Sequence, residues 1–165
     1  MGLFRQRVSP ASGLSLQFIY RQNKSDMIKN VLLIDDDPFC NRMNGFVLER
    51  YVAPDAIVTF ENAMDALKYL RGLIIKGDIG SFPDVLLLDL HMSYMDGWGF
   101  LDEFGKLPAS FRTRAQVFIL TSSIQPADKE RAKLRTDVSG YIEKPFTLAE
   151  LEYVVSYCGG HQPRS

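Results

Sequence analysis

The sequence predicts a doubly wound α/β fold, in which a five-stranded parallel sheet carries helices on both faces. Short, strongly apolar runs alternate along the chain with segments of helical periodicity. Parallel strands need long crossover connections, and these helical segments supply them. The apolar runs are continuous rather than alternating, which indicates strands that are buried on both faces. The chain has 165 residues, a length typical of one domain.

The first half of the chain carries signals for two strands and two helices. Residues 31–34 are continuously apolar, and Asp37-Pro38 is a typical helix start because Asp caps a helix and Pro fits its first turn. Residues 56–60 form a β-rich run, and residues 63–75 show helical spacing up to the breaks at Gly77 and Gly80. In the first helix, which should run to the break at Pro54, apolar residues recur at Phe39, Met43, Phe46, Val47 and Tyr51.

The second half continues the same alternation. Strands are expected at residues 85–88, 117–120 and 140–142. A short helix through 99–101, a helical segment at 126–134 and a closing helix at 146–157 should connect and follow them, with a polar loop around Pro108 and Arg112. Asp96 before Gly97 is typical of a turn. Aromatic residues beyond that turn are expected to serve packing only: Trp98, Phe100 and Phe104.

Composition limits the possible partners and location. The 19 basic and 20 acidic residues leave a net charge of −1, which gives no reason to expect nucleic-acid binding. Cys40 and Cys158 are far apart and lack metal-binding spacing, which favours reduced thiols in a cytosolic protein. No apolar run reaches the roughly 20 residues needed to span a bilayer. We therefore expect a cytoplasmic protein with neither a nucleic-acid nor a membrane partner.

The two ends of the chain are expected to lie outside the folded domain. Residues 1–29 carry five basic residues against one acidic residue and predict a flexible N-terminal extension, followed by the domain at 30–159 and a C-terminal tail at 160–165. The apolar stretch at 14–20 is too short and too interrupted for a secretory signal. The Arg- and Ser-rich composition of the extension is also compatible with an organelle transit peptide, and this alternative stays open.

Acidic residues follow two of the expected strands. Asp35 and Asp36 come directly after the first strand and Asp89 after the third, at the carboxyl edge where parallel sheets bind ligands. At about 4 Å and an effective dielectric of about 20, each like-charge pair would repel by roughly 4 kcal/mol. A divalent cation would offset this repulsion, and a few carboxylates open to water and phosphate favour Mg²⁺. Asp37 is explained as the helix cap instead.

Two further strand ends carry groups that suit phosphoryl chemistry. Thr121 follows the fourth strand and offers a hydroxyl donor, while Lys144 follows the fifth and brings a positive charge. The bond from Lys144 to Pro145 can be cis, which would fix a tight turn and point the lysine inward. A carboxylate nucleophile, a metal, a donor and an ammonium group together form a set that can act on one transferring phosphoryl group.

These residues give the region 30–159 a resemblance to the receiver domain of two-component response regulators. The matching motifs are Asp35-Asp36, Asp89 with Met92 and Met95-Asp96-Gly97, Thr121-Ser122, and Lys144-Pro145-Phe146. The resemblance implies a flavodoxin-like sheet of order 2-1-3-4-5 and a phosphoacceptor, Asp89. It also implies Mg²⁺ ligation directly by Asp36, Asp89 and the backbone carbonyl of His91, and mainly through water by Asp35. Phosphoryl binding is implied for Thr121 and Lys144, switching for Thr121 and Tyr141, and tuning of the phosphate lifetime for the side chains of His91 and Ser123. Ser93 departs from the pattern, because the family usually has proline there.

The resemblance implies a single-domain response regulator in a phosphorelay, not an enzyme beyond self-catalysed phosphotransfer and slow dephosphorylation. The phosphoryl donor would be a sensor histidine kinase or a phosphotransfer protein. Output is expected through contact with another protein, at the last strand and last two helices, or through onward phosphate transfer. One alternative is a haloacid-dehalogenase-like phosphatase that uses Asp35 as nucleophile. A second alternative is a receiver fold that serves only as a docking module without phosphorylation.

Overall fold

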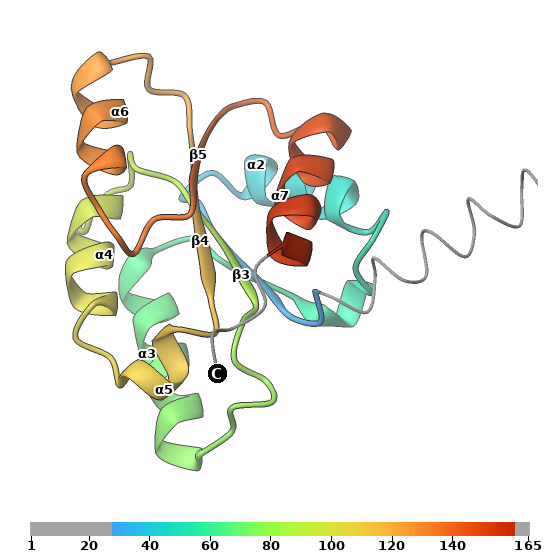
Figure 1. Ribbon diagram of the computed structural model, residues 1–165, viewed down its shortest axis with the longest axis vertical. Coiled ribbons are helices and arrows are strands. Elements are labelled where there is room, and N and C mark those ends of the chain that lie inside the picture. The colour runs from blue at the N-terminus through green and yellow to red at the C-terminus, as the bar shows by residue number, and fades with distance from the viewer. Residues whose placement is uncertain (1–27, 161–165) are drawn as a thin grey trace, which may run out of the picture.

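The structure, a computed structural model, describes residues 28–160 and contains one five-stranded, all-parallel sheet (Figure 1). The strand order is β2-β1-β3-β4-β5, as the sequence analysis predicts. The strands are β1 (Val31–Ile34), β2 (Ile57–Phe60), β3 (Val85–Leu88), β4 (Gln116–Thr121) and β5 (Gly140–Glu143). The helices are α2 (Pro38–Leu48), the 3-10 turn η1 (Pro54–Ala56), α3 (Ala63–Lys76), α4 (Gly97–Phe104), α5 (Ala109–Arg112), α6 (Pro126–Lys133) and α7 (Leu148–Gly160).

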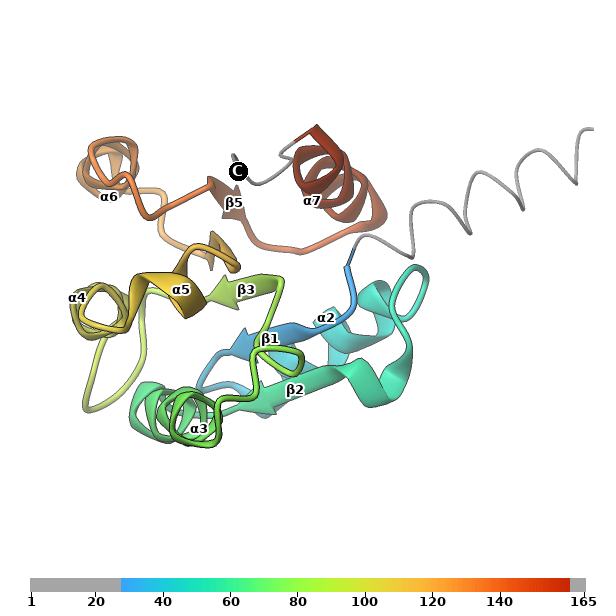
Figure 2. The ribbon, with the colours of Figure 1, turned by 60° about the horizontal axis from the view of Figure 1, so that its bottom comes forward.

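Helices cover both faces of the sheet, which produces two apolar cores. Figure 2 shows α3, α4 and α6 on one face and α2 and α7 on the other. Successive strand residues point to opposite faces: Leu86 and Ile119 pack into the first core, whereas Leu87 and Phe118 pack into the second. All four residues of β3 are buried, so the continuous apolar run has the explanation that the sequence predicts.

Helix α2 begins where predicted, but part of its apolar spacing faces solvent rather than the core. The Asp37 side chain caps the helix by accepting a hydrogen bond from the Phe39 N–H, which confirms its predicted role. However, Phe39 is 67% exposed and Phe46 is 51% exposed, while Asn41 and Leu48 are buried. The helix also ends at Leu48, before the expected break.

Two loops also differ from the sequence expectation. The expected polar loop around Pro108 and Arg112 contains the short helix α5. Asp96 does more than form a turn: its carboxylate accepts a 2.7 Å hydrogen bond from the Gly99 N–H and caps α4. The cap fixes the start of α4 close to the end of β3.

The amino end of the described chain is attached to the sheet. Residues 1–27 of the expected extension lie outside the described part, but Ile28 is buried, and the N–H groups of Lys29 and Asn30 donate to Asp84 Oδ2 at 2.8 and 3.0 Å. Arg114 pairs with the other oxygen of Asp84 at 2.8 Å. None of the helices between residues 28 and 160 is long and apolar enough to cross a membrane.

Candidate functional site

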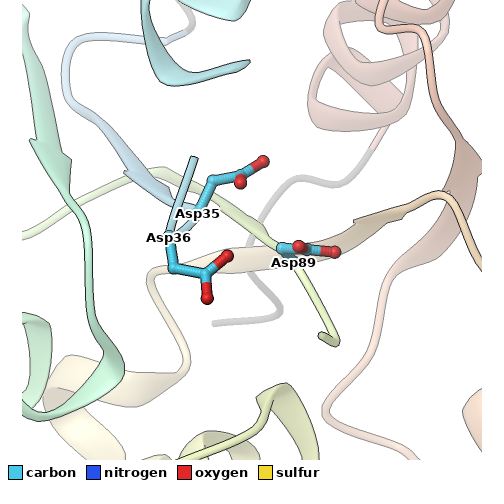
Figure 3. A group of neighbouring side chains, drawn as sticks. All are labelled: Asp35, Asp36 and Asp89. Carbon is cyan, nitrogen blue, oxygen red and sulfur yellow. The ribbon is translucent and has the colours of Figure 1, made fainter. Parts of the chain in front are cut away.

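The acidic residues that follow β1 and β3 converge at the carboxyl edge of the sheet (Figure 3). Ile34 and Leu88 are partners in the register of the two strands, so the residues after them lie side by side. One carboxylate oxygen from each of Asp35, Asp36 and Asp89 lies within 4.8 Å of the others. Asp35 and Asp89 are buried and Asp36 is partly exposed. The sequence analysis predicts this convergence.

Lys144 brings a positive charge to the two buried carboxylates. Its Nζ lies 2.6 Å from Asp35 Oδ2 and 3.3 Å from Asp89 Oδ2. The Lys144 N–H donates a 2.9 Å hydrogen bond to the Thr121 carbonyl, which ties the end of β5 to β4, and the peptide bond from Lys144 to Pro145 is cis. Burial acts to lower the pKa of Lys144, but the two carboxylates outweigh it and the pKa is raised. The lysine is therefore protonated at neutral pH.

The contacts of Asp35 offset only part of the cost of burying its negative charge. Its Oδ1 accepts a 3.0 Å hydrogen bond from the Asp37 N–H, and Oδ2 faces Lys144. Burial nevertheless raises the pKa of Asp35 above its ordinary value, and the charge of Asp89 adds to this effect. Ionised Asp35 is thus a cost to the folded protein in the absence of a further cation.

Asp89 Oδ1 is buried and has no hydrogen-bond partner among the described residues. A buried carboxylate oxygen without a partner is costly, and a bound cation or phosphoryl chemistry would account for it. The donor set consists of carboxylate oxygens, one of them on a partly exposed residue, which suits Mg²⁺ with water in its remaining positions. The residues present therefore fit the metal that the sequence predicts.

A second group of predicted residues lies at the ends of β4 and β5. Thr121 is fully buried; its hydroxyl lies 3.4 Å from His91 Nδ1 and accepts a 3.1 Å hydrogen bond from the Ser123 N–H. The Tyr141 hydroxyl donates to the Ser123 carbonyl at 3.0 Å. Ser123 Oγ donates to Asp128 on α6 at 2.6 Å. The predicted switch residues are thus connected to α6 through Ser123.

Three residues that shape the site escape the sequence analysis in this role. Asn41 Nδ2 donates to the carbonyl groups of Asp35 and Phe60, and so fixes the loop after β1 to the end of β2. A Cβ on Gly97 would lie 2.5 Å from the Asp89 carbonyl oxygen, so only glycine fits there. The third is Ser93, whose N–H and hydroxyl both donate hydrogen bonds to Asp36, one of the candidate metal ligands. Two of the three carry a sequence signal: Gly97 is part of the Met95-Asp96-Gly97 motif, and Ser93 stands where the family usually has proline.

An all-parallel sheet of order β2-β1-β3-β4-β5 with an acidic site at its carboxyl edge defines a flavodoxin-like α/β domain. The chain belongs to the response regulator receiver domain family, whose sequence model matches residues 31–156. Receiver domains are the phosphoacceptor domains of two-component signalling, and they typically hold Mg²⁺ at an acidic pocket. The family is thus a signalling family, in agreement with the sequence analysis.

Individual relatives agree with this assignment. The chain is 30% identical over 130 residues to the regulatory protein AtoC of Escherichia coli. The aligned region covers 78% of this chain and 24% of AtoC. It thus spans about a quarter of that relative. A two-component response regulator from Cytophaga hutchinsonii superposes with a TM-score of 0.73 at 26% identity, covering 81% of this chain and 98% of the other. The phosphorylated cyanobacterial phytochrome response regulator RcpA does so with a TM-score of 0.61 at 30% identity, covering 77% and 88%.

Proposed function

We propose that this receiver domain accepts a phosphoryl group on Asp89 from a histidine kinase or a phosphotransfer protein and thereby changes its binding to another protein. The observation that carries the choice of Asp89 is its buried Oδ1, which has no hydrogen-bond partner among the described residues, while its Oδ2 lies 3.3 Å from Lys144 Nζ. In Asp35, by contrast, Oδ1 accepts a hydrogen bond from the Asp37 N–H and Oδ2 forms the shorter ion pair with Lys144, at 2.6 Å. Asp35 is therefore a poorer nucleophile than Asp89, which argues against the phosphatase alternative.

The transfer forms one bond and breaks one. An Asp89 carboxylate oxygen attacks the phosphorus of a phosphohistidine, and the N–P bond breaks with its electron pair returning to the imidazole. Asp35, Asp36, Asp89 and the His91 carbonyl would hold Mg²⁺, which when bound neutralises charge on the phosphoryl oxygens. Lys144 and the Thr121 hydroxyl would bind the same oxygens. For this contact Lys144 must move its ammonium group away from Asp35.

The donor would approach the site beside helix α2. Phe39 and Phe46 are large apolar residues on the exposed surface of this helix, which begins immediately after the acidic pair. Exposed apolar groups beside a reactive site are typical of a protein-binding surface. We therefore assign donor docking to the exposed α2 surface, formed by Phe39, Met43 and Phe46.

The signal would pass to a downstream protein through the residues at the ends of β4 and β5. Movement of Thr121 toward a phosphoryl group on Asp89 would disturb its hydrogen bond with Ser123 and so the links from Ser123 to Tyr141 and Asp128. His91 and Ser123 flank this path and would tune the lifetime of the phosphate. The surface of β5, α6 and α7 would then bind the downstream protein. The free thiols of Cys40 and Cys158 agree with a cytoplasmic location.

Incubation with acetyl phosphate and Mg²⁺, followed by intact-mass measurement, tests the proposal. We expect the wild type to gain the mass of one phosphoryl group and Asp89→Asn to gain none. Asp55→Asn, at an exposed position of η1, is the matched control and should label like the wild type. Labelling that persists in Asp89→Asn but disappears in Asp35→Asn would support the phosphatase chemistry instead. A wild type that neither labels nor binds beryllofluoride would support the docking-module alternative.

A further inference from the structure

Asp36 is held in place by a residue from a different loop. The Ser93 N–H donates to Asp36 Oδ2 at 2.9 Å, and the Ser93 hydroxyl donates to the same oxygen at 3.2 Å. The two residues are 57 positions apart in the sequence. Asp36 follows β1 and Ser93 follows β3, so the two hydrogen bonds join the loops on either side of the acidic site.

The main chain around Ser93 is shaped for this contact. The Met95 N–H donates to the Ser93 carbonyl at 2.8 Å, and Tyr94 between them has a φ of 67°. This left-handed conformation is unfavourable for a residue other than glycine, asparagine or aspartate. Tyr94 itself projects fully into solvent. The tight turn therefore serves the direction of the Ser93 main chain rather than the packing of Tyr94.

Without Ser93, electrostatics would move Asp36 out of the site. Asp36 lies within 4.8 Å of the carboxylates of Asp35 and Asp89, and Lys144 is paired with those two. A partly exposed side chain can relieve such repulsion by rotating into water. Hydrogen bonds to a carboxylate are charge-assisted and oppose this rotation. Both of them use Oδ2, so Oδ1 can face a cation without losing either bond.

We infer that Ser93 is a positioning residue that keeps Asp36 in the Mg²⁺ ligand set before the cation arrives. The inference rests on the proposed function, because it concerns the affinity of the same site. Outer groups that orient a metal ligand commonly change metal affinity by about 10- to 100-fold. Proline, which the family usually has here, offers neither an N–H nor a hydroxyl. This chain thus gains two donors to Asp36 that the usual residue cannot supply.

A Mg²⁺ titration of a graded series of variants tests the inference. Trp98 lines the same cavity as Asp36 and Ser93, so its fluorescence should report binding, and the Mg²⁺-dependent rise in melting temperature gives a second measurement. Ser93→Thr keeps both donors and should bind like the wild type. Ser93→Ala loses the hydroxyl and should bind about threefold more weakly, and Ser93→Pro loses both donors and should bind at least about 10-fold more weakly.

The outcomes separate this inference from the proposed function. If the wild type shows no Mg²⁺ response, the proposed function itself fails. If the wild type responds, and Ser93→Ala and Ser93→Pro bind Mg²⁺ as tightly as the wild type does, only the role of Ser93 is overturned. Should Ser93→Pro not fold, equal affinities of Ser93→Ala and Ser93→Thr overturn it in the same way. Ser110→Ala, at an exposed position of α5, controls for loss of a surface hydroxyl and should leave the affinity unchanged.

A direct structural measurement complements the titration. In the Mg²⁺-free protein, the amide proton of Ser93 should show the downfield NMR shift of a hydrogen bond to a carboxylate. Asp36→Ala should remove this shift, while Asp55→Ala should not affect it. A Ser93 amide shift that is the same in Asp36→Ala and in the wild type would show that the positioning contact does not form in solution.

Discussion

The ammonium group of Lys144 lies closer to Asp35 than to Asp89, the predicted phosphoacceptor: the distances from Nζ are 2.6 Å and 3.3 Å. The lysine side chain is 15% exposed, and those of Asp35 and Asp89 are 5% and 6% exposed. In this arrangement Lys144 has a structural role in the metal-free protein, as the counter-charge of two buried carboxylates, besides its proposed role in phosphoryl binding. Its two tasks can be separated experimentally, because only one of them needs a phosphoryl donor.

Replacing Lys144 should destabilise the metal-free protein. Lys144→Met leaves two buried carboxylates without a counter-charge, and the free energy of unfolding at neutral pH should fall by about 3 kcal/mol. Mg²⁺ should restore part of this loss, because a cation can replace the missing charge. Urea unfolding with and without Mg²⁺ measures both effects. Lys129→Met, which removes an exposed pair with Glu143, should change stability by less than about 1 kcal/mol; equal losses in the two variants would contradict the prediction.

Asp35 should show the opposite behaviour in the absence of metal. Burial raises its pKa, so the carboxyl stabilises the fold below its ordinary pKa and loses this contribution as the pH rises through the raised value. Asp35→Asn is never charged and should therefore raise the free energy of unfolding at neutral pH by about 1 kcal/mol. The difference from the wild type should shrink as the pH falls and Asp35 becomes protonated. Melting curves over an acidic to neutral pH series measure this change.

Metal should reverse that order of stability. Mg²⁺ at about 100 times its Kd stabilises a protein that binds it by about 2.7 kcal/mol, a gain that Asp35→Asn should largely lack. Asp55→Asn, at an exposed site, should match the wild type within about 0.5 kcal/mol at every pH. A lower stability of Asp35→Asn than of the wild type in metal-free buffer at neutral pH would show that ionised Asp35 is not a cost.

The sheet and the charged residues of the site could be predicted because their signals are local. β1 and β3 have the predicted bounds, since a strand buried on both faces must be continuously apolar. Asp35, Asp89 and Lys144 directly follow strands, and the parallel topology is sufficient to bring such residues to one edge. No contact between distant loops has to be known for either conclusion.

The contacts between loops could not be predicted in this way. The bonds from Ser93 to Asp36 depend on how two loops approach each other, and a motif indicates only that proline is missing. The same holds for α2, because helical spacing shows which side chains share a face and not which face meets the sheet. There the sheet edge presents the carbonyl groups of Asp35 and Phe60, and Asn41 satisfies both. The helix therefore turns its polar residues inward and leaves Phe46 outside.

The orientation of α2 predicts that its exposed apolar residues matter for binding and not for stability. Phe46→Ser, at a half-exposed position, should change the free energy of unfolding by no more than about 0.5 kcal/mol. Leu48→Ala, at a position that is 1% exposed, should cost about 3 kcal/mol. Urea unfolding measures both values. Phe46→Ser should still label with acetyl phosphate but receive phosphate more slowly from a protein donor; similar destabilisation by the two substitutions would mean that Phe46 is part of the core.

Gly97 should be the least replaceable glycine near the site. A Cβ there would lie 2.5 Å from the Asp89 carbonyl oxygen and 2.9 Å from Leu90 Cα, both of which are main-chain atoms that cannot move independently. Gly97→Ala should therefore lower the free energy of unfolding by about 2 kcal/mol. It should also slow labelling by acetyl phosphate, because the strain displaces the segment that carries Asp89.

Gly72 provides the matched control for this substitution. It lies inside helix α3, and a Cβ added there would meet nothing within 4 Å. Gly72→Ala should raise the free energy of unfolding by about 0.5 to 1 kcal/mol, because alanine loses less conformational entropy in a helix than glycine does. The two substitutions thus have opposite expected signs in one urea-unfolding experiment. A neutral or stabilising Gly97→Ala that labels normally would show that α4 does not need its close approach to Asp89.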